Sequence, residues 1–216
     1  MQSEKTPYRA IAAIAGVAAI AFFAGILVAG LGRSQLELPD VEGLLWPNPP
    51  SVKDFSLLDA NGAPFTREAL LGRWSFMFFG FSQCPDVCPT TIQTLKEVKN
   101  DLRDSETFSN SGQVVFVSVD PDRDTPEILK QYLAYFDPTF IGLSGAENKL
   151  KALTTPLGIL FGKIPSGETY TVDHSASILL IDPKGRVLGL FSMPHEAKQL
   201  SRAFKAISEF YVQTTS

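Results

Sequence analysis

The chain has 216 residues, of which 44% are hydrophobic and 19% are charged. This length suits one sizeable domain plus an appendage, and this composition excludes a disordered chain. The formal net charge is −4 and the sequence has no basic block, so it lacks the electrostatic pattern of a nucleic-acid-binding protein.

The run of residues 10–32, AIAAIAGVAAIAFFAGILVAGLG, contains no ionisable side chain. At about 1.5 Å per residue, a helix of this length crosses a hydrocarbon layer of about 30 Å. We therefore predict a single transmembrane helix after a short tail at residues 1–9. Lys5 and Arg9 precede the run and acidic residues follow it, which places the tail in the cytoplasm and the rest of the chain outside.

A cleaved secretory signal is the alternative for this run, although the run exceeds the usual apolar segment of such signals. The start of the chain, MQSEKTPYR, lacks the Arg- and Ser-rich character of an organelle transit peptide. We therefore expect a single-pass protein of the bacterial inner membrane with a periplasmic domain. A proline-rich linker is predicted at residues 33–52 and the globular domain at residues 53–216.

The first half of the domain predicts a hairpin followed by a βαβ unit. Short apolar segments flank Asn61-Gly62, a pair that favours a tight turn with positive φ at both central positions. Residues 74–81 are continuously apolar, as in a strand buried on both faces, and residues 89–102 have helical spacing. Residues 114–119 repeat the buried-strand pattern, and Thr125-Pro126-Glu127 opens a helix that extends to about Phe136.

The second half predicts a helix at residues 146–157 and strands within SGETYTVDHSASILLIDPKGRVLGLF, around a turn at residues 182–185. A last amphipathic helix is expected from about His195 to Tyr211. This order predicts an α/β fold: a thioredoxin-like central sheet flanked by helices, with an N-terminal hairpin and an N-terminal transmembrane helix.

Cys84 and Cys88, the two cysteines of the chain, follow the first buried strand where the next helix opens. In open α/β sheets, ligands bind beyond the carboxyl ends of the parallel strands. A separation of four residues brings both thiols to one side of the first helical turn, where free N–H groups and the helix dipole favour the thiolate. We therefore expect two reactive thiols that point the same way.

The spacing and position of Cys84 and Cys88 are compatible with three kinds of site. A structural disulfide would close a very short loop and stabilise the fold by about 1–2 kcal/mol. A redox-active dithiol fits the fold, although such pairs usually have the spacing Cys-x-x-Cys. A site for a soft metal ion tolerates the wider spacing.

A metal site needs at least one further ligand, and the chain has two histidines. His174 precedes an apolar strand, and if that strand runs antiparallel to the one ending at Phe81, His174 lies at the edge where the cysteines are. His195 stands at the start of the last helix, where a capping role or a solvent-exposed side chain explains the presence of a histidine. Two sulfurs and one imidazole suit Cu(I) in a trigonal site, whereas structural zinc requires a fourth ligand.

Three segments, FFGFSQCPDVCPTT, VSVDPDRDTPE and DHSASILLIDPKG, resemble the Sco/SenC family of membrane-anchored, thioredoxin-fold copper proteins. This family helps to assemble the binuclear copper centre of cytochrome c oxidase. The resemblance spans about residues 45–211. It implies a copper-binding domain in which the sulfurs of Cys84 and Cys88 and a ring nitrogen of His174 bind Cu(I) or Cu(II). It also implies the copper-centre subunit of the oxidase as a partner, with a periplasmic copper donor or thiol reductant as a further one.

Acidic residues near these ligands have two interpretations. By the resemblance, Asp120 or Asp122 would orient His174 or receive a partner, as carboxylates around metal ligands often do. Alternatively, residues 120–124 form a solvated turn that caps the next helix. Asp86, between the cysteines, is a carboxylate at a helix N-terminus or a neighbour of the metal.

The resulting hypothesis is a carrier that passes copper to the oxidase from a reduced Cys84 and Cys88 pair, which would lose the metal on oxidation to a disulfide. The alternative is a thiol-disulfide reductase that keeps the copper-binding cysteines of the oxidase reduced. A peroxidase of related fold is a third option, but Gly80, Phe81 and Ser82 stand where its threonine is expected. His174 distinguishes the carrier from the reductase.

Overall fold

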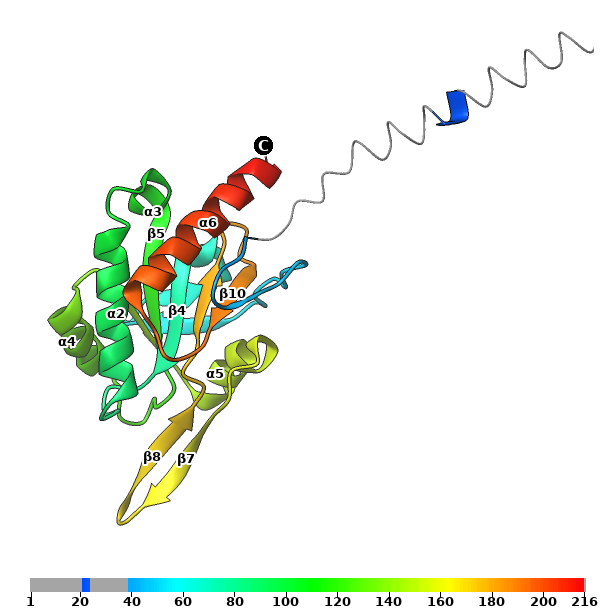
Figure 1. Cartoon of the computed structure of the whole chain (residues 1–216). Coiled ribbons are helices and arrows are strands. Elements are labelled where there is room, and N and C mark those ends of the chain that lie inside the picture. The colour runs from blue at the N-terminus through cyan, green and yellow to red at the C-terminus, as the bar shows by residue number, and fades with distance from the viewer. Residues whose placement is uncertain (1–20, 24–38, 216) are drawn as a thin grey trace, which may run out of the picture. The chain divides into compact units, whose positions relative to one another are not determined.

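The computed structural model describes residues 21–23 and 39–215 (Figure 1). Residues 21–23 are helical, while the rest of the predicted transmembrane run, the tail and residues 33–38 lie outside the described residues. Among the described helices, none combines the length and the apolar character needed to span a bilayer. The chain divides into two units, residues 1–37 and 38–216, and the second unit contains the sheets and the helices described below.

The main sheet of this unit has eight strands in the order β1-β10-β9-β4-β5-β6-β2-β3. The strands are β1 (Leu44–Leu45), β2 (Ser56–Asp59), β3 (Pro64–Thr66), β4 (Trp74–Gly80), β5 (Gly112–Ser118), β6 (Ile141–Ser144), β9 (Ile178–Ile181) and β10 (Val187–Phe191). Strands β4, β5 and β6 are parallel, and β9 runs antiparallel to β4. The predicted α/β fold is therefore confirmed within the described residues.

Helices cover both faces of this sheet. They are α2 (Val87–Asp101), α3 (Glu106–Ser111), α4 (Pro126–Phe136), α5 (Glu147–Thr154) and α6 (Ala197–Thr215), with short 3-10 helices η1 (Arg67–Leu70) and η2 (Thr155–Leu157). Helices α2 and α6 pack together, and α5 lies across the sheet from them in Figure 1.

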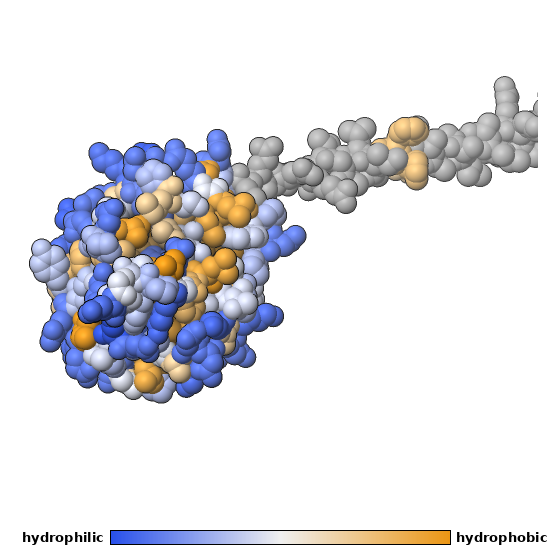
Figure 2. Space-filling model, turned by 90° about the horizontal axis from the view of Figure 1, so that it is seen from below, coloured by the Kyte–Doolittle hydropathy of each residue, from blue (hydrophilic) through white to orange (hydrophobic). Residues whose placement is uncertain are grey.

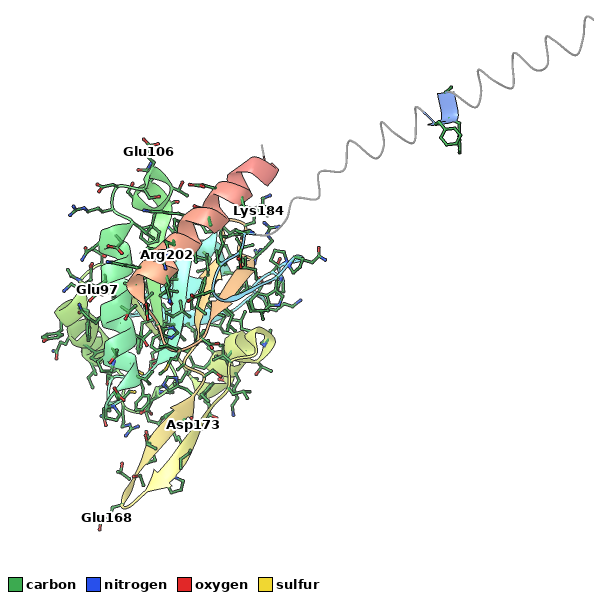
Figure 3. All side chains as sticks on the ribbon, in the orientation of Figure 1. Glu97, Glu106, Glu168, Asp173, Lys184 and Arg202 are labelled. Atoms are coloured by element: carbon green, nitrogen blue, oxygen red, sulfur yellow. The ribbon has the colours of Figure 1, made fainter. Side chains whose placement is uncertain are left out.

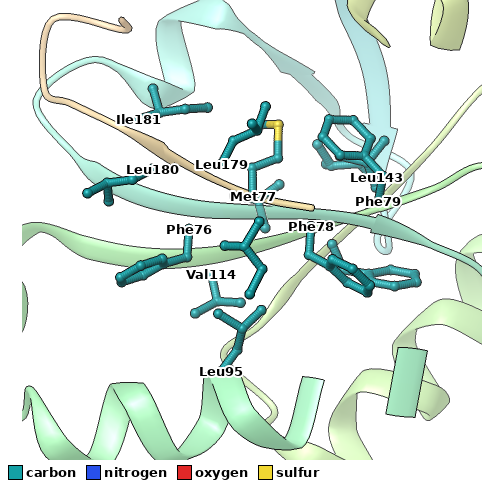
Figure 4. Packing of buried hydrophobic residues seen from close by; sticks show 14 of the residues in the cluster. Phe76, Met77, Phe78, Phe79, Leu95, Val114, Leu143, Leu179, Leu180 and Ile181 are labelled. Carbon is teal, nitrogen blue, oxygen red and sulfur yellow. The ribbon is translucent and has the colours of Figure 1, made fainter. Parts of the chain in front are cut away.

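Strand β4 forms the centre of the core because all seven of its residues are buried. Its side chains alternate between the two faces of the sheet, as the strand geometry requires. Figure 4 shows Phe76 and Phe78 on the side of Leu95 from α2, whereas Met77 and Phe79 point to the opposite side. Because β4 is packed on both faces, the loop that follows Gly80 starts from a fixed position.

The predicted βαβ unit is confirmed, with small shifts at its boundaries. Helix α2 begins at Val87 rather than Pro89, so Cys88 lies inside its first turn. Thr125 caps α4 by accepting a hydrogen bond from the Ile128 amide, and Pro126 is the first helical residue. Both features match the cap predicted for this segment.

The turn predicted at Asn61-Gly62 is present as a hairpin connection, but its predicted geometry is wrong. Gly62 has a φ of 78°, whereas no described residue other than glycine has a positive φ. The connection between β2 and β3 is four residues long, and the Asp59 carboxylate accepts hydrogen bonds from the amides of Asn61 and Ala63, both at 2.8 Å. An aspartate turn therefore replaces the two-residue turn.

Two further features differ from the sequence prediction. Strand β1 pairs with β10 and Val52 is 1% exposed, so the globular unit begins inside the segment predicted as linker. Strands β7 (Phe161–Ser166) and β8 (Thr169–His174) form a separate hairpin that extends from one end of the domain (Figure 1). Strand β7 was not predicted, since most of its residues are exposed and give no apolar pattern.

Charged side chains of both signs are spread over the surface of this unit. Figure 3 labels Glu97, Glu106, Lys184 and Arg202 on the body of the domain and Glu168 at the tip of the hairpin.

Candidate metal centre

The two cysteines lie where β4 ends and α2 begins, as predicted. Cys84 is in the turn before the helix and is partly exposed, whereas Cys88 is fully buried. Neither forms a disulfide in this structure. The Cys88 amide points at Cys84 Sγ at 3.4 Å, so a free N–H group at the start of the helix interacts with the more accessible sulfur.

His174 is the last residue of β8 and reaches the cysteines from the other side. Strand β9, which starts four residues later, is antiparallel to β4 with Ile178 opposite Phe78, so this predicted condition is confirmed. The Nε2 atom of His174 lies 3.5 Å from Cys88 Sγ. Its Nδ1 atom is 3.3 Å from the carbonyl oxygen of Ser175, and because a carbonyl only accepts, Nδ1 is the protonated nitrogen. The unprotonated Nε2 therefore faces the sulfurs, as a metal ligand must.

The three ligand atoms of Cys84, Cys88 and His174 all lie within 4.8 Å of one another. Bonds of roughly 2.0–2.3 Å to one ion in a trigonal site place ligand atoms about 3.5–4 Å apart, so a small contraction of the cluster brings the three atoms into range. Two thiolates and one imidazole form a donor set for a soft ion. The residues therefore fit the metal that the sequence predicts.

Burial sets the electrostatics of this cluster. Burial raises the pKa of the Cys88 thiol well above its usual range, and the nearby Cys84 and Asp124 act in the same direction. Burial also lowers the pKa of His174, against smaller opposing effects of the Ser175 carbonyl and Asp173. Near neutral pH the imidazole is thus unprotonated and ready to bind, whereas a metal must displace the proton of Cys88.

Aromatic rings and a glycine enclose the buried side of the cluster. The ring of His174 packs edge-on against Phe81 at 5.8 Å and against Phe78 at 6.3 Å between centroids. A Cβ atom on Gly80 would meet Cys88 Sγ at 2.7 Å. The cluster is therefore dry on one side and open to solvent mainly at Cys84 and His174.

The three acidic residues predicted near the ligands lie in different surroundings. Asp120 is buried and accepts hydrogen bonds from Tyr170 Oη, at 2.8 Å, and from Arg123. Asp122 is exposed and pairs with Lys163 of β7. Asp86 is exposed at the N-cap of α2, and its side chain makes no capping bond. Their predicted role beside the metal stays a prediction.

The alternative of a solvated turn at residues 120–124 is wrong for two of its residues. Asp120 is 0% exposed and Asp124 is 1% exposed. The cap of α4 comes instead from Thr125. Asp124 was not singled out from the sequence, because three aspartates and an arginine within five residues give no sign of which carboxylates are buried.

His195 lies outside the ligand cluster, as expected from its position before α6. It is neither a cap nor fully exposed: its ring is half-buried and Nε2 donates to the carbonyl of Ala176 at 2.9 Å. Its Nδ1 atom is buried and has no hydrogen-bond partner among the described residues. Burial lowers the pKa of His195, although the Ala176 hydrogen bond partly opposes this effect.

The surface beside His174 is apolar in part. An open groove of about 380 Å³ is lined by Ile164 and His174 of the hairpin and by Leu160, which directly precedes β7. Leu160 is 73% exposed and Ile164 is 46% exposed. Figure 2 looks at the domain from below, the side from which the hairpin extends in Figure 1, and shows hydrophobic residues grouped between hydrophilic ones.

A family model, curated relatives and solved structures all match this chain to the same protein family. The model of the SCO1/SenC family matches residues 47–209. A SCO2-like protein of Rickettsia felis is 36% identical over 159 residues, which cover 70% of this chain and 74% of the relative. The structure of Bradyrhizobium japonicum ScoI with copper bound has a TM-score of 0.63 at 33% identity, covering 76% of this chain and 98% of that one. The crystal structure of yeast Sco1 with copper bound has a TM-score of 0.66 at 32% identity, covering 78% and 91%.

Proposed function

Because the chain belongs to the SCO1/SenC family, we propose that it binds copper and delivers it to the binuclear copper centre of cytochrome c oxidase during assembly. Cys84, Cys88 and His174 are the proposed ligands. The observation that carries this proposal is their geometry: residues up to 90 positions apart in the chain bring two sulfurs and an unprotonated imidazole nitrogen within 4.8 Å. Copper-bound structures of related proteins support the choice of metal.

The proposed transfer is an exchange of ligands. A thiolate of the target replaces first the more accessible sulfur, Cys84, so the ion is held by both proteins before it leaves Cys88 and His174. Each step would exchange one bond to Cys84, Cys88 or His174 for one bond to the target, and hence no step leaves the ion without ligands. The exposed side chains of Leu160 and Ile164 offer the target a contact surface next to this exit.

The proposed location is the bacterial inner membrane, with residues 10–32 as a single-pass anchor and the domain in the periplasm. This part of the proposal depends on the sequence, because most of the run lies outside the described residues. An oxidase copper centre on the same side of the membrane would be within reach of a tethered carrier.

The test is copper binding by the reduced full-length chain, purified in detergent, with His174→Ala. Loss of one of three ligands is expected to weaken copper binding by more than about 100-fold, since even the outer partners of metal ligands contribute about 10–100-fold. His195→Gln is the matched control, because glutamine keeps an N–H donor for Ala176, and its affinity should stay within about threefold of the unchanged chain. Equal copper binding with and without the His174 imidazole would refute the ligand assignment.

A second candidate function is a thiol-disulfide reductase, which the two free, unequally exposed thiols favour. Cys84 thiolate would attack a disulfide of the target to form a mixed disulfide. Cys88 thiolate would then attack Cys84, releasing the target dithiol and leaving a Cys84–Cys88 disulfide, with two electrons transferred. A periplasmic dithiol would have to reduce that disulfide for another cycle.

The two functions differ in their dependence on His174. His174→Ala should leave the rate of disulfide exchange largely intact while it removes tight copper binding. A chain that stays metal-free in copper-containing buffer while it reduces the target disulfide would favour the reductase.

A further inference from the structure

The candidate centre is assembled from two halves that belong to different sheets. The cysteines follow β4 of the main sheet, whereas His174 ends β8 of the separate two-stranded sheet. The loop at residues 120–124, which connects β5 to α4, forms hydrogen bonds with both halves. We call it the bridging loop.

Asp124 holds the cysteine half. Its carboxylate accepts hydrogen bonds from the backbone amide of Ser82 at 3.0 Å and from the Ser82 hydroxyl at 2.5 Å. The Ser118 hydroxyl, at the end of β5, donates to the same carboxylate at 2.5 Å. Ser82 stands two residues before Cys84, and the Cys84 amide in turn donates to the Phe81 carbonyl at 3.2 Å. The carboxylate thus ties the turn that carries Cys84 to the neighbouring strand.

Arg123 holds the histidine half. Its guanidinium group stacks 4.0 Å from the centroid of the Tyr170 ring and donates from Nη1 to the Tyr170 carbonyl at 3.0 Å. Tyr170 lies on β8, four residues before His174. Asp120 completes this arm, because it accepts from both Arg123 and the Tyr170 hydroxyl.

Burial indicates that these contacts are more than incidental surface pairs. Asp120 and Asp124 are at most 1% exposed, and a buried carboxylate is tolerated only where hydrogen bonds replace its lost hydration. Asp124 has three such bonds, all from groups next to the cysteine turn or on the strand beside it. A serine-carboxylate cluster of this kind fixes one backbone arrangement of the turn.

We propose that Asp124 and Arg123 are positioning residues that set the separation between the two sulfurs and His174 Nε2. Asp124 fixes the turn that carries Cys84, and Arg123 fixes the strand that carries His174. The bridging loop thereby holds the two halves of the centre in a fixed relative position. The inference rests on the proposed function where copper affinity is used to measure the separation between the two sulfurs and His174 Nε2. It makes a separate claim about the metal-free chain, where the same bonds are present.

Asp124→Asn tests the cysteine arm in the detergent-purified full-length chain. The amide keeps the shape but presents one N–H₂ group to donors, so the turn at Ser82 should loosen. Copper affinity of the reduced chain should fall by tenfold or more, with a changed absorption spectrum of the copper-loaded site. Asp182→Asn is the matched control, because Asp182 is also a fully buried carboxylate that accepts backbone N–H bonds, from Lys184 and Arg186 in the β9–β10 turn. The control should lower the unfolding temperature and leave copper affinity within about twofold.

Hydrogen exchange in the metal-free chain separates this inference from the proposed function. Asp124→Asn should accelerate exchange of the Ser82 and Cys84 amides at least tenfold, and Asp182→Asn should not. Ser82→Ala and Ser118→Ala each remove one hydrogen bond from a hydroxyl to Asp124, and both should accelerate amide exchange by a smaller factor. These two variants replace Asp124→Asn if that variant does not fold. Unchanged exchange in all three variants would overturn the proposal, whatever the chain does with copper.

Arg123→Lys tests the histidine arm. Lysine keeps the charge but loses the planar stack on Tyr170 and the fixed reach to its carbonyl, so copper affinity should again fall by tenfold or more. Full copper affinity in both Arg123→Lys and Asp124→Asn, with loss in His174→Ala, would refute the positioning role and leave the carrier function standing. If the unchanged chain binds no copper, the carrier function fails and the exchange measurement alone decides the inference.

Discussion

Cys84 and Cys88 are chemically unequal although they stand four positions apart. Cys88 is 0% exposed and burial raises its pKa, whereas Cys84 is partly exposed and its sulfur accepts an N–H group at the start of α2. Thiol reagents and metal-bearing partners react with accessible thiolates, so Cys84 is the sulfur that meets them first.

Alkylation of the reduced, metal-free chain tests this inequality. We expect iodoacetamide at neutral pH to modify Cys84 in the Cys88→Ser variant at least tenfold faster than Cys88 in the Cys84→Ser variant. Mass spectrometry measures both rates. The unfolded chains, alkylated in denaturant, are the control and should react at similar rates. Equal rates in the folded variants would contradict the assignment of Cys84 as the entry sulfur.

His195 makes the stability of the domain depend on pH. Its Nε2 donates to the carbonyl of Ala176, and its buried Nδ1 finds no partner in the described part of the chain, so protonation would bury an N–H group without an acceptor there. Burial therefore lowers the pKa of His195 from its ordinary value of 6.5. The unfolded chain then binds the proton more readily, and the folded state is stabilised above about pH 6.5 and loses this contribution as the pH falls.

The prediction is a decrease in the unfolding free energy of the metal-free fragment 39–216 between about pH 7.5 and pH 5. His195→Gln should make this decrease smaller, because glutamine keeps the donor to Ala176 and does not titrate. Urea denaturation at both pH values gives the comparison. His174 contributes in the same direction, so part of the slope should survive. A slope of unchanged size in the variant would show that His195 is not responsible.

At the scale of the elements, β4 positions the site because its end is packed against the buried sulfur. Gly80 closes the strand, and a Cβ there would lie 2.7 Å from Cys88 Sγ and 3.0 Å from the ring of Phe116. Both neighbours belong to well-packed elements, so neither has free space into which to move.

Gly80→Ala is therefore expected to destabilise the domain by about 1–3 kcal/mol through overpacking, and to weaken copper binding by displacing Cys88. Gly162→Ala is the matched control, because a Cβ on Gly162 in β7 would meet nothing within 4 Å. Denaturant unfolding should show a lower stability, and copper competition a lower copper affinity, for Gly80→Ala than for Gly162→Ala. Similar behaviour of both would mean that the contact between Gly80 and Cys88 has no effect.

The sequence predicted those elements whose residues are buried in regular patterns. The continuous apolar run of β4 and the cap at Thr125 locate the βαβ unit and the cysteine turn, and the apolar strand after His174 locates that histidine. Strand β7 was missed because its exposed residues show no alternation. The bridging contacts of Asp124 and Arg123 were missed because they join residues 42 and 47 positions apart, which no local pattern reveals.

Across the domain as a whole, the first described residues and the hairpin that ends at His174 lie on different elements. Asp40 and Val41 line a groove together with Gln199 and Arg202 of α6, whereas the hairpin that ends at His174 extends from the lower end of the domain in Figure 1. This arrangement within the second unit suits a carrier that is tethered through its N-terminus and meets its target with the other end.

Membrane fractionation tests the proposed tether. The full-length chain should stay in the membrane pellet after alkaline carbonate washing, since residues 10–32 provide an uncharged run long enough to span a bilayer. The fragment 39–216 should be soluble. Recovery of the full-length gene product as a soluble, shortened protein would favour the cleaved signal instead.

The most direct test of the copper site is X-ray absorption at the copper edge of the reduced, copper-loaded full-length chain. We expect two sulfur ligands and one imidazole nitrogen, with the imidazole signal lost in His174→Ala and retained in His195→Gln. A copper site with no sulfur ligand, or an imidazole signal that persists without His174, would refute the assignment of Cys84, Cys88 and His174 as ligands.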